Sequence, residues 1–210
     1  MWVLIPVRAW LVKGPDGVSL VDAGLPFMAK GILRAIDTLG LGPLTRILLT
    51  HGHGDHVGAI LGILKHGPTP VYAHRVELPY MEGDKAYPRR KKARASVPKG
   101  LVVPLSETPG GSLKEVAGLF PYLTPGHSPG HVVYYHRKDR VLIGGDLAMT
   151  KRGALRPPIA MFTSDMDSAI RSMGILRQLE PARLEVCHAD PIERPAERFD
   201  AFVMQRQVSA

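Results

Sequence analysis

Apolar residues at the start of the chain form two short runs that predict strands, followed by a stretch with helical spacing. The two runs cover residues 1–12 and 17–22, and the turn KGPDG between them is typical of tight hairpins. The first run has neither a basic start nor a small-residue cleavage site, so it is interpreted as a strand and not as a signal peptide. Over residues 26–39 the apolar positions fit one face of a helix. We therefore expect a hairpin followed by a helix.

A strand-helix-strand unit is predicted next. TRILLT at 45–50 and TPVYAH at 69–74 are short apolar runs typical of strands. Between them, four apolar residues fall at i, i+3, i+4 and i+7, namely Val57, Ile60, Leu61 and Leu64. This spacing predicts an amphipathic helix that begins near Asp55 and ends near residue 66. The polar residues just before it therefore lie on a strand-to-helix turn.

Short strand-like runs return after residue 100. They are LVVPL, LFPYLT, HVVYYH, RVLIGGD and RLEVCH. Ser164 is expected to cap a helix over 165–179, and a last helix is expected over 192–205. Because strands and helices mix in both halves, the pattern predicts an α/β layered sandwich. A chain of 210 residues that is 45% hydrophobic can bury one large core, so we expect a single domain over 1–210.

Positive charge is concentrated in one segment. The chain has a formal net charge of +8, and residues 85–99 hold seven basic residues and no acidic one. The rest of the chain is nearly neutral, so a nucleic-acid partner is not expected. Residues 77–100, interrupted by proline and glycine, are expected to form a surface excursion or a lid. Its run PRRKKAR is expected to be a solvated loop, with an anionic substrate or an RNA backbone as the alternatives for what it binds.

The apolar runs are too short to cross a membrane, and a single cysteine, Cys187, fits a reducing compartment. We therefore expect no membrane partner and a cytoplasmic location. Cys187 itself is expected to be a small buried residue.

Seven side chains that can bind a divalent cation lie after apolar runs, in or beside turns. They are His51, His53, Asp55, His56, His127, Asp146 and His188. Four of them lie within LLTHGHGDHVGAI, where Gly52 and Gly54 are expected to adopt unusual backbone angles that let the ligands converge. His-x-His-x-Asp-His on a strand-to-helix turn is specific for a metal site. The turn therefore predicts a metal centre and not merely a capped helix with surface histidines.

The later positions are less specific one by one. His127 fits an ordinary loop, Asp146 a strand-end cap and His188 a partly buried histidine, and only the set as a whole indicates a shared site. His131 is left open between orienting a ligand or contacting substrate and stabilising its turn. The remaining histidines, His66, His74 and His136, are expected to be structural or solvated.

Together, THGHGDHVGAI, TPGHSPGH, the GGD that ends at Asp146 and the late His188 resemble the metallo-β-lactamase-fold hydrolase superfamily, particularly its glyoxalase-II-like and lactonase-like members. The resemblance extends from VDAG, where Asp22 matches an early acidic position beside the site, to His188. It implies a four-layer αβ/βα sandwich, in which two mixed sheets are flanked by helices and the site lies at one edge.

The resemblance also implies a ligand set and a reaction. His51, His53 and His127 would hold one metal, Asp55, His56 and His188 a second, and Asp146 would bridge them. The cofactors would be two divalent ions, Zn²⁺ first, with Fe or Mn as alternatives. A metal-bridging hydroxide would attack a small-molecule ester, lactone or thioester, and Asp55 would orient this nucleophile or pass a proton to the leaving group. The substrate could be anionic.

Three departures leave the substrate open. Met149 stands where quorum-signal lactonases often have a tyrosine, only 22 residues follow His188 where glyoxalase II has a helical region, and Asp146 stands where zinc β-lactamases of one class have a cysteine. The alternatives are a phosphodiesterase or nuclease of the same fold, a mononuclear iron sulfur dioxygenase, and a metal-binding protein without catalytic activity.

Overall fold

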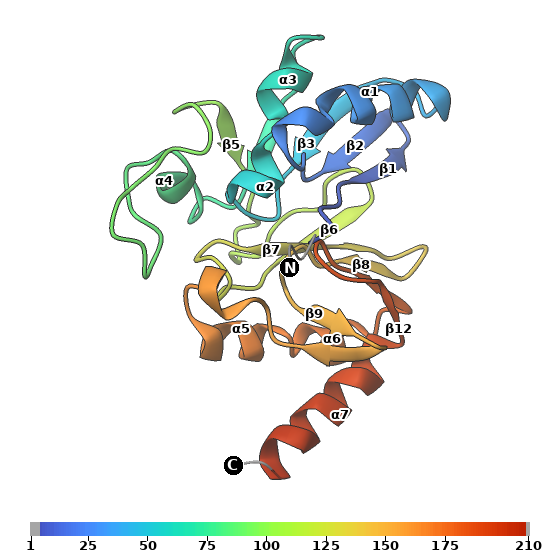
Figure 1. Cartoon of the computed structure of the whole chain (residues 1–210). Coiled ribbons are helices and arrows are strands. Elements are labelled where there is room, and N and C mark those ends of the chain that lie inside the picture. Colours follow the sequence, from blue (N-terminus) through green and yellow to red (C-terminus); the bar gives the residue numbers. More distant parts are fainter. Residues whose placement is uncertain (1–4, 209–210) are drawn as a thin grey trace.

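The computed structural model describes residues 5–208, and two five-stranded sheets face each other at its centre (Figure 1). The first sheet has the order β1-β2-β3-β4-β5, with an antiparallel β1–β2 hairpin and parallel pairing from β2 onward. Its strands are β1 (Trp10–Gly14), β2 (Gly17–Val21), β3 (Leu44–Leu48), β4 (Val71–Ala73) and β5 (Val102–Pro104).

The second sheet has the order β12-β11-β8-β7-β6. Its one parallel pair, β8 with β11, places the ends of these two strands side by side. The strands are β6 (Leu119–Leu123), β7 (Val132–His136), β8 (Val141–Ile143), β11 (Arg183–Glu185) and β12 (Ile192–Glu193). A separate hairpin of β9 (Met149–Lys151) and β10 (Ala154–Arg156), which the pattern did not predict, follows β8.

Helices cover the outer face of each sheet (Figure 1). The first sheet is covered by η1 (Pro26–Met28), α1 (Ala29–Thr38), α2 (Gly54–Val57) and α3 (Ile60–Leu64). The second is covered by α5 (Met166–Ser172), α6 (Ile175–Leu179) and α7 (Pro195–Val208). The short helices α4 (Leu78–Met81) and η2 (Ala160–Phe162) lie in the long connections.

The buried side chains form three clusters that match these layers. Ile47 belongs to the cluster under α1 and α3, whereas its neighbour Leu48 belongs to the cluster between the sheets, as the two-residue period of a strand requires. Across the middle of the molecule, the Tyr134 hydroxyl donates a hydrogen bond to the Leu49 carbonyl at 2.9 Å. The arrangement of helix, sheet, sheet and helix confirms the predicted αβ/βα sandwich.

Four predicted elements differ in detail. The last helix, predicted over 192–205, is α7 over Pro195–Val208, because Ile192 and Glu193 pair with β11 as strand β12. The first strand is predicted over 1–12, of which residues 1–4 lie outside the described range. Strand β1 begins at Trp10, because residues 6 and 8 instead make contacts with the distant segment 187–190. The helix after the histidine turn breaks at Gly58, whose N–H donates to Gly24 at 2.8 Å. A Cβ on Gly58 would lie 2.8 Å from that carbonyl oxygen, so the close approach needs glycine.

The helix predicted over 165–179 is two helices, α5 and α6, separated at Met173–Gly174. Its cap is Asp165 and not Ser164, since the Asp165 carboxylate accepts the Ser168 N–H at 3.0 Å. Within residues 5–208, no helix has both the length and the apolar character that crossing a bilayer requires.

Candidate metal centre

The seven predicted ligands lie on segments that follow four strands. The turn after β3 carries His51 to His56, the β6–β7 connection carries His127, and the segments after β8 and β11 carry Asp146 and His188. Since β3 belongs to one sheet and the other three segments to the second, the two halves of the molecule contribute to the same site.

Three of these residues form the first group, His51, His53 and His127, whose ligand atoms lie within 4.8 Å of one another. Nδ1 of His53 lies 2.9 Å from Nε2 of His51 and 3.0 Å from Nε2 of His127. The three imidazole nitrogens therefore face a common point, as the ligands of one cation would.

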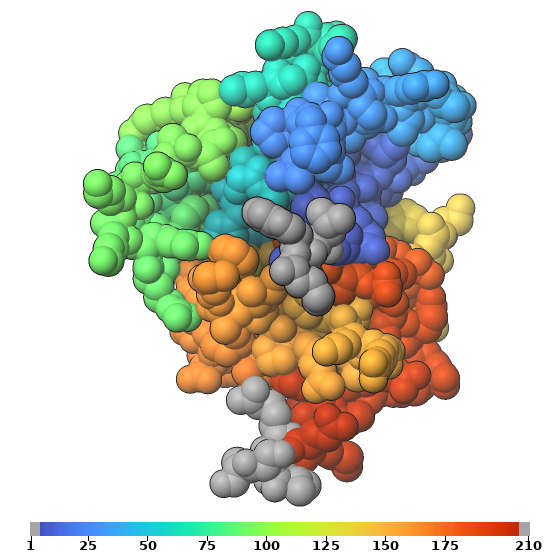
Figure 2. Space-filling model, in the orientation of Figure 1, coloured from blue at the N-terminus to red at the C-terminus, as the bar shows by residue number. Residues whose placement is uncertain are grey.

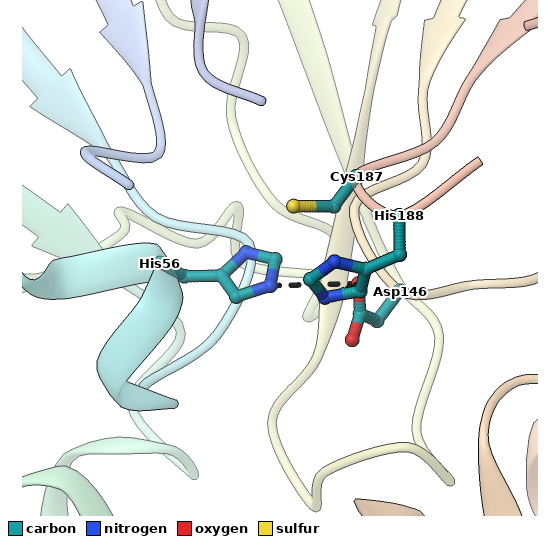
Figure 3. A group of neighbouring side chains, drawn as sticks. All are labelled: His56, Asp146, Cys187 and His188. Carbon is teal, nitrogen blue, oxygen red and sulfur yellow. Dashed lines mark ion pairs between the residues drawn. The ribbon is translucent and has the colours of Figure 1, made fainter. Parts of the chain in front are cut away.

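The second group is His56, Asp146, Cys187 and His188, again with ligand atoms within 4.8 Å (Figure 3). Asp146 Oδ1 lies 3.4 Å from His56 Nε2 and 3.3 Å from His188 Nε2. Its second oxygen, Oδ2, lies 3.1 Å from His127 Nε2 in the first group. The Asp146 carboxylate thus lies between the two groups, with one oxygen toward each.

Asp55 and Cys187 take different places around the second group. Asp55 Oδ2 lies 3.2 Å from His188 Nε2, although Asp55 is not one of the clustered ligands. Cys187 is fully buried as predicted, and its sulfur exchanges hydrogen bonds of 3.5 and 3.6 Å with the main chain of Arg8. Cys187 therefore reaches the second group but is held by the segment before β1.

The glycines of the histidine turn act differently from the prediction. Neither Gly52 nor Gly54, both within the described range, has a positive φ, so unusual backbone angles are not the reason for them. Instead a Cβ on Gly52 would lie 2.5 Å from the Tyr87 hydroxyl and 2.5 Å from Met81 Cβ. Position 52 therefore requires a residue without a side chain, because the excursion packs directly against the turn.

Four of the histidines have their remaining ring nitrogen held by an outer partner, and these contacts fix the rings so that the other nitrogen faces the site. The partners are Thr50 Oγ1 for His51 at 3.1 Å, Asp22 Oδ2 for His56 at 2.7 Å, Thr163 Oγ1 for His127 at 3.3 Å and the Pro6 carbonyl for His188 at 2.8 Å. Asp22, which the resemblance placed beside the site, also accepts the Thr50 N–H and hydroxyl, each at 2.8 Å.

His131 acts on Asp146 from outside both groups. Its Nε2 accepts the main-chain N–H of Asp146 at 3.2 Å, and its Nδ1 lies 2.9 Å from the Thr124 hydroxyl. Because an N–H donates to Nε2, the ring proton must be on Nδ1. Burial lowers the pKa of His131 to about 4, so the ring is neutral. The structure thus places His131 where it orients Asp146.

Glu77 is a buried carboxylate that the sequence reading did not single out. It accepts hydrogen bonds from Gly52 N at 3.0 Å, the Tyr87 hydroxyl at 2.6 Å, the Ser128 hydroxyl at 2.9 Å and Gly130 N at 2.7 Å. Burial raises the pKa of Glu77, although the four donors favour its ionised form. This one carboxylate joins the His51 turn, the His127 loop and the excursion. Nothing in local periodicity distinguishes such a residue, because its partners lie 10 to 53 positions away.

The other three histidines lie outside the two groups. His66 is exposed, His74 is buried and accepts the Val76 N–H at 3.3 Å, and His136 Nδ1 lies 3.0 Å from Asp139 Oδ2.

The protonation of the site fits a cation. Burial lowers the pKa of His53 to about 4 and that of His127 to about 3, and it lowers the pKa of His51 far below the usual value. These neutral rings offer lone pairs at neutral pH. Burial by itself lowers the pKa of His188, but hydrogen bonds to Asp146 and Asp55 outweigh it and raise the pKa to about 12. The proton on His188 therefore offsets the negative charge of Asp146 and Asp55, and a bound cation would offset the same charge.

Two buried atoms in the second group face each other at 3.4 Å without making a hydrogen bond of good geometry. Among the described residues, His56 Nε2 and Asp146 Oδ1 are buried side-chain atoms without a hydrogen bond. Leaving buried polar atoms unpaired costs about 1–3 kcal/mol each. A cation held by the two groups would satisfy both atoms, so the donor set fits divalent metal binding.

A cavity of about 510 Å³ opens onto both groups. Its polar lining includes His53, Asp55, Asp146 and His188, and most of the rest is apolar. Met149, which stands at the position of the lactonase tyrosine, does not line this cavity and packs against the core of the second sheet instead.

Comparison with known proteins identifies the family. The model of the metallo-beta-lactamase superfamily matches residues 2–188. The probable metallo-hydrolase YybB of Bacillus subtilis is 39% identical over 201 residues, which are 96% of this chain and 89% of that protein. The probable metallo-hydrolase YflN of the same organism is 35% identical over 95% of this chain and 86% of that protein.

A solved structure gives the same result. The crystal structure of TTHA1623 in a di-iron-bound form has a TM-score of 0.69 and 29% sequence identity, covering 93% of this chain and 96% of that one. The chain belongs to the metallo-beta-lactamase superfamily, and its class of activity is that of a metal-dependent hydrolase.

Proposed function

We propose that the chain is a dinuclear hydrolase that cleaves a small ester, lactone or thioester. The observation that carries this proposal is the placement of Asp146, whose two carboxylate oxygens face one histidine-containing group each. A mononuclear site would need only one group, so the second supports two ions and argues against the sulfur dioxygenase alternative. Iron is as compatible as zinc, because a related structure holds two irons.

We assign the ligands as the sequence resemblance implied. His51, His53 and His127 would hold one ion, Asp55, His56 and His188 the other, and Asp146 both. When bound, such ions activate water for attack and polarise the scissile carbonyl.

The chain's own residues supply the remaining requirements. Asp55 is 34% exposed at the side chain and lines the cavity, so its carboxylate can hold an attacking water or return a proton to the leaving group. His131 and Asp22 keep the ligands oriented, and the apolar cavity walls exclude water from the acyl part of a substrate.

Replacing Asp146 by Asn tests the assignment of the two ions. The amide keeps the shape of the side chain but loses the charge and one acceptor, so we expect bound metal to fall from two ions per chain to one or none. Hydrolysis should fall by about a thousandfold or more. Metal content by plasma mass spectrometry and turnover of a panel of esters, lactones and thioesters give the two readouts.

The control is Asp190→Asn, which changes an exposed carboxylate between β11 and β12 that pairs with Arg8. It should keep two ions and full turnover. Two ions retained in the Asp146 variant would reject the bridging assignment. Turnover of bis(p-nitrophenyl) phosphate without turnover of any ester, lactone or thioester would favour the phosphodiesterase alternative.

A further inference from the structure

The residues of PRRKKAR, 88–94, are all exposed, as predicted for a solvated loop, but the basic segment at 85–99 is fixed in position where that run begins. At Tyr87–Arg90 the chain turns, with Arg90 N donating to the Tyr87 carbonyl at 2.9 Å. On one side the turn is held by the Tyr87 hydroxyl on Glu77, and on the other Arg89 Nη1 donates to the carbonyls of Ala160 and Thr163, both at 3.2 Å. Figure 2 shows the green excursion in contact with the orange segment at this point. The turn is therefore fixed on two sides of the site.

This turn places one guanidinium at the cavity. Arg90 is the only Lys or Arg among the lining residues described, and its Cζ lies 5.7 Å from the centre of the Phe162 ring, which also lines the cavity. No carboxylate among residues 5–208 pairs with Arg90, whereas Lys99 of the same segment pairs with Asp84 at 2.7 Å. A positive charge thus lies at the exposed rim of the cavity, with an aromatic ring as its neighbour.

The rest of the wall indicates what this charge faces. Ile5, Val7, Leu25, Ile159 and Phe162 surround the cavity, and Ile5 and Phe162 are 45% and 40% exposed. An apolar wall binds a hydrocarbon part of a ligand. A guanidinium at the edge of such a wall binds a carboxylate in a planar, two-point geometry, more strongly than it would in open water.

We propose that Arg90 is a specificity-determining residue that binds a carboxylate on the substrate. The preferred substrates are then esters, lactones or thioesters whose apolar acyl part carries an acidic group. This inference rests on the proposed function, because it names the substrate class of the same site.

A nucleic-acid backbone fits the same arrangement less well. Phosphates repeat along a strand and need several cations along one path. Lys91, Lys92 and Arg94 are exposed and do not line the cavity, so only one positive side chain of the segment faces it.

Two esters that differ only at the end of the acyl chain test the proposal. They are p-nitrophenyl hexanoate and the mono-p-nitrophenyl ester of adipic acid, which has a carboxylate in place of the last methyl group. For the metal-loaded enzyme we expect a lower KM for the acidic ester. Arg90→Gln should raise that KM by about tenfold, leave kcat nearly unchanged and leave the hexanoate ester unaffected. Arg90→Lys should retain part of the preference.

The matched control is Lys92→Gln, which removes the same charge from an exposed residue outside the cavity. It should preserve the preference. If both glutamine variants lost the preference for the acidic ester equally, the preference would depend only on the net charge of the segment, and the proposal would be overturned. An acidic preference that survives Arg90→Gln would also overturn it, since the carboxylate would then bind elsewhere, for example at the ions.

Binding of uncleaved analogues separates this inference from the proposed function. Calorimetry compares the monoamide of adipic acid with hexanamide. If no ester, lactone or thioester is cleaved, the proposed function fails, but tighter binding of the adipic monoamide that Arg90→Gln abolishes still supports the carboxylate site. Equal binding of the two amides to the unchanged protein overturns it.

Discussion

At the scale of single residues, the positions of the predicted ligands depend on neighbours that bind no metal. Asp146 is held between two groups, and the main-chain N–H of this same residue is accepted by His131. If this hydrogen bond is lost, a buried N–H is left without a partner and the loop that carries the bridging carboxylate can shift. His131 is therefore a positioning residue.

Replacing His131 by Ala should lower metal affinity by about 10- to 100-fold, the range found for lost outer partners of metal ligands. His131→Gln should retain more of the affinity, because the amide oxygen can take the place of Nε2 as acceptor. Competition with a chromophoric chelator measures both variants. Equal affinities for the two variants would show that the hydrogen bond to Asp146 N does not matter.

At the scale of elements, the excursion is part of the site's framework. Glu77 is the residue before α4, and through its four donors this short helix is joined to the loops that carry two metal groups. Tyr87 also packs against His53, with ring centres 4.9 Å apart. The segment between β4 and β5 therefore both stabilises the histidine turn and presents Arg90 to the cavity.

Tyr87→Phe removes one donor from a buried carboxylate and should lower the free energy of unfolding by about 1–3 kcal/mol. Glu77→Gln should cost at least as much, because its NH₂ group would face N–H and O–H donors. Urea unfolding measures both changes. The control is Tyr80→Phe, since the Tyr80 ring stacks on Tyr87 at 5.3 Å and its hydroxyl makes no hydrogen bond among the described residues. If Tyr87→Phe proved as stable as Tyr80→Phe, Glu77 would not have the proposed structural role.

At the scale of the whole molecule, the site lies where the two halves meet and takes residues from both of them. The segment before β1 crosses to the second half of the molecule. There the Pro6 carbonyl accepts a hydrogen bond from His188 Nδ1, and the Arg8 side chain donates one to the Cys187 carbonyl at 3.3 Å. The charge state of the histidines therefore affects the stability of the entire fold.

For protein stripped of metal, we expect stability to be greatest near pH 6.5. His53 and His127 have pKa values lowered to about 4 and 3, so their contribution is present above 6.5 and is lost as pH falls toward 4 and the unfolded chain takes up protons. His188 has a pKa raised to about 12, so its contribution is present below 6.5 and declines as pH rises above it. Urea unfolding at pH 4.5, 6.5 and 8.5 should show a maximum at the middle value. A steady rise to pH 8.5 would contradict the assignment for His188.

Much of the fold could be predicted because most strands of the two sheets and the helices that cover them are visible in local periodicity. The apolar run at 17–22 and the helical spacing over 26–39 correspond to β2 and to η1 with α1. The breaks in the two amphipathic helices could not be predicted in the same way. Gly58 ends α2 because a distant main chain approaches it, and periodicity contains no information about that contact.

The sequence by itself predicted a metal centre, because seven side chains that can bind a cation follow strands and gather where those strand ends meet, and the resemblance of its motifs to a known superfamily implied a hydrolase. Only the tertiary structure decided how they are held and what else faces them. Pro6 lies 182 positions from His188, and Glu77 lies 51 positions from Ser128. Contacts of this range are set by how the two sheets and the excursion pack, and the same packing turned one arginine of a charged run toward the cavity.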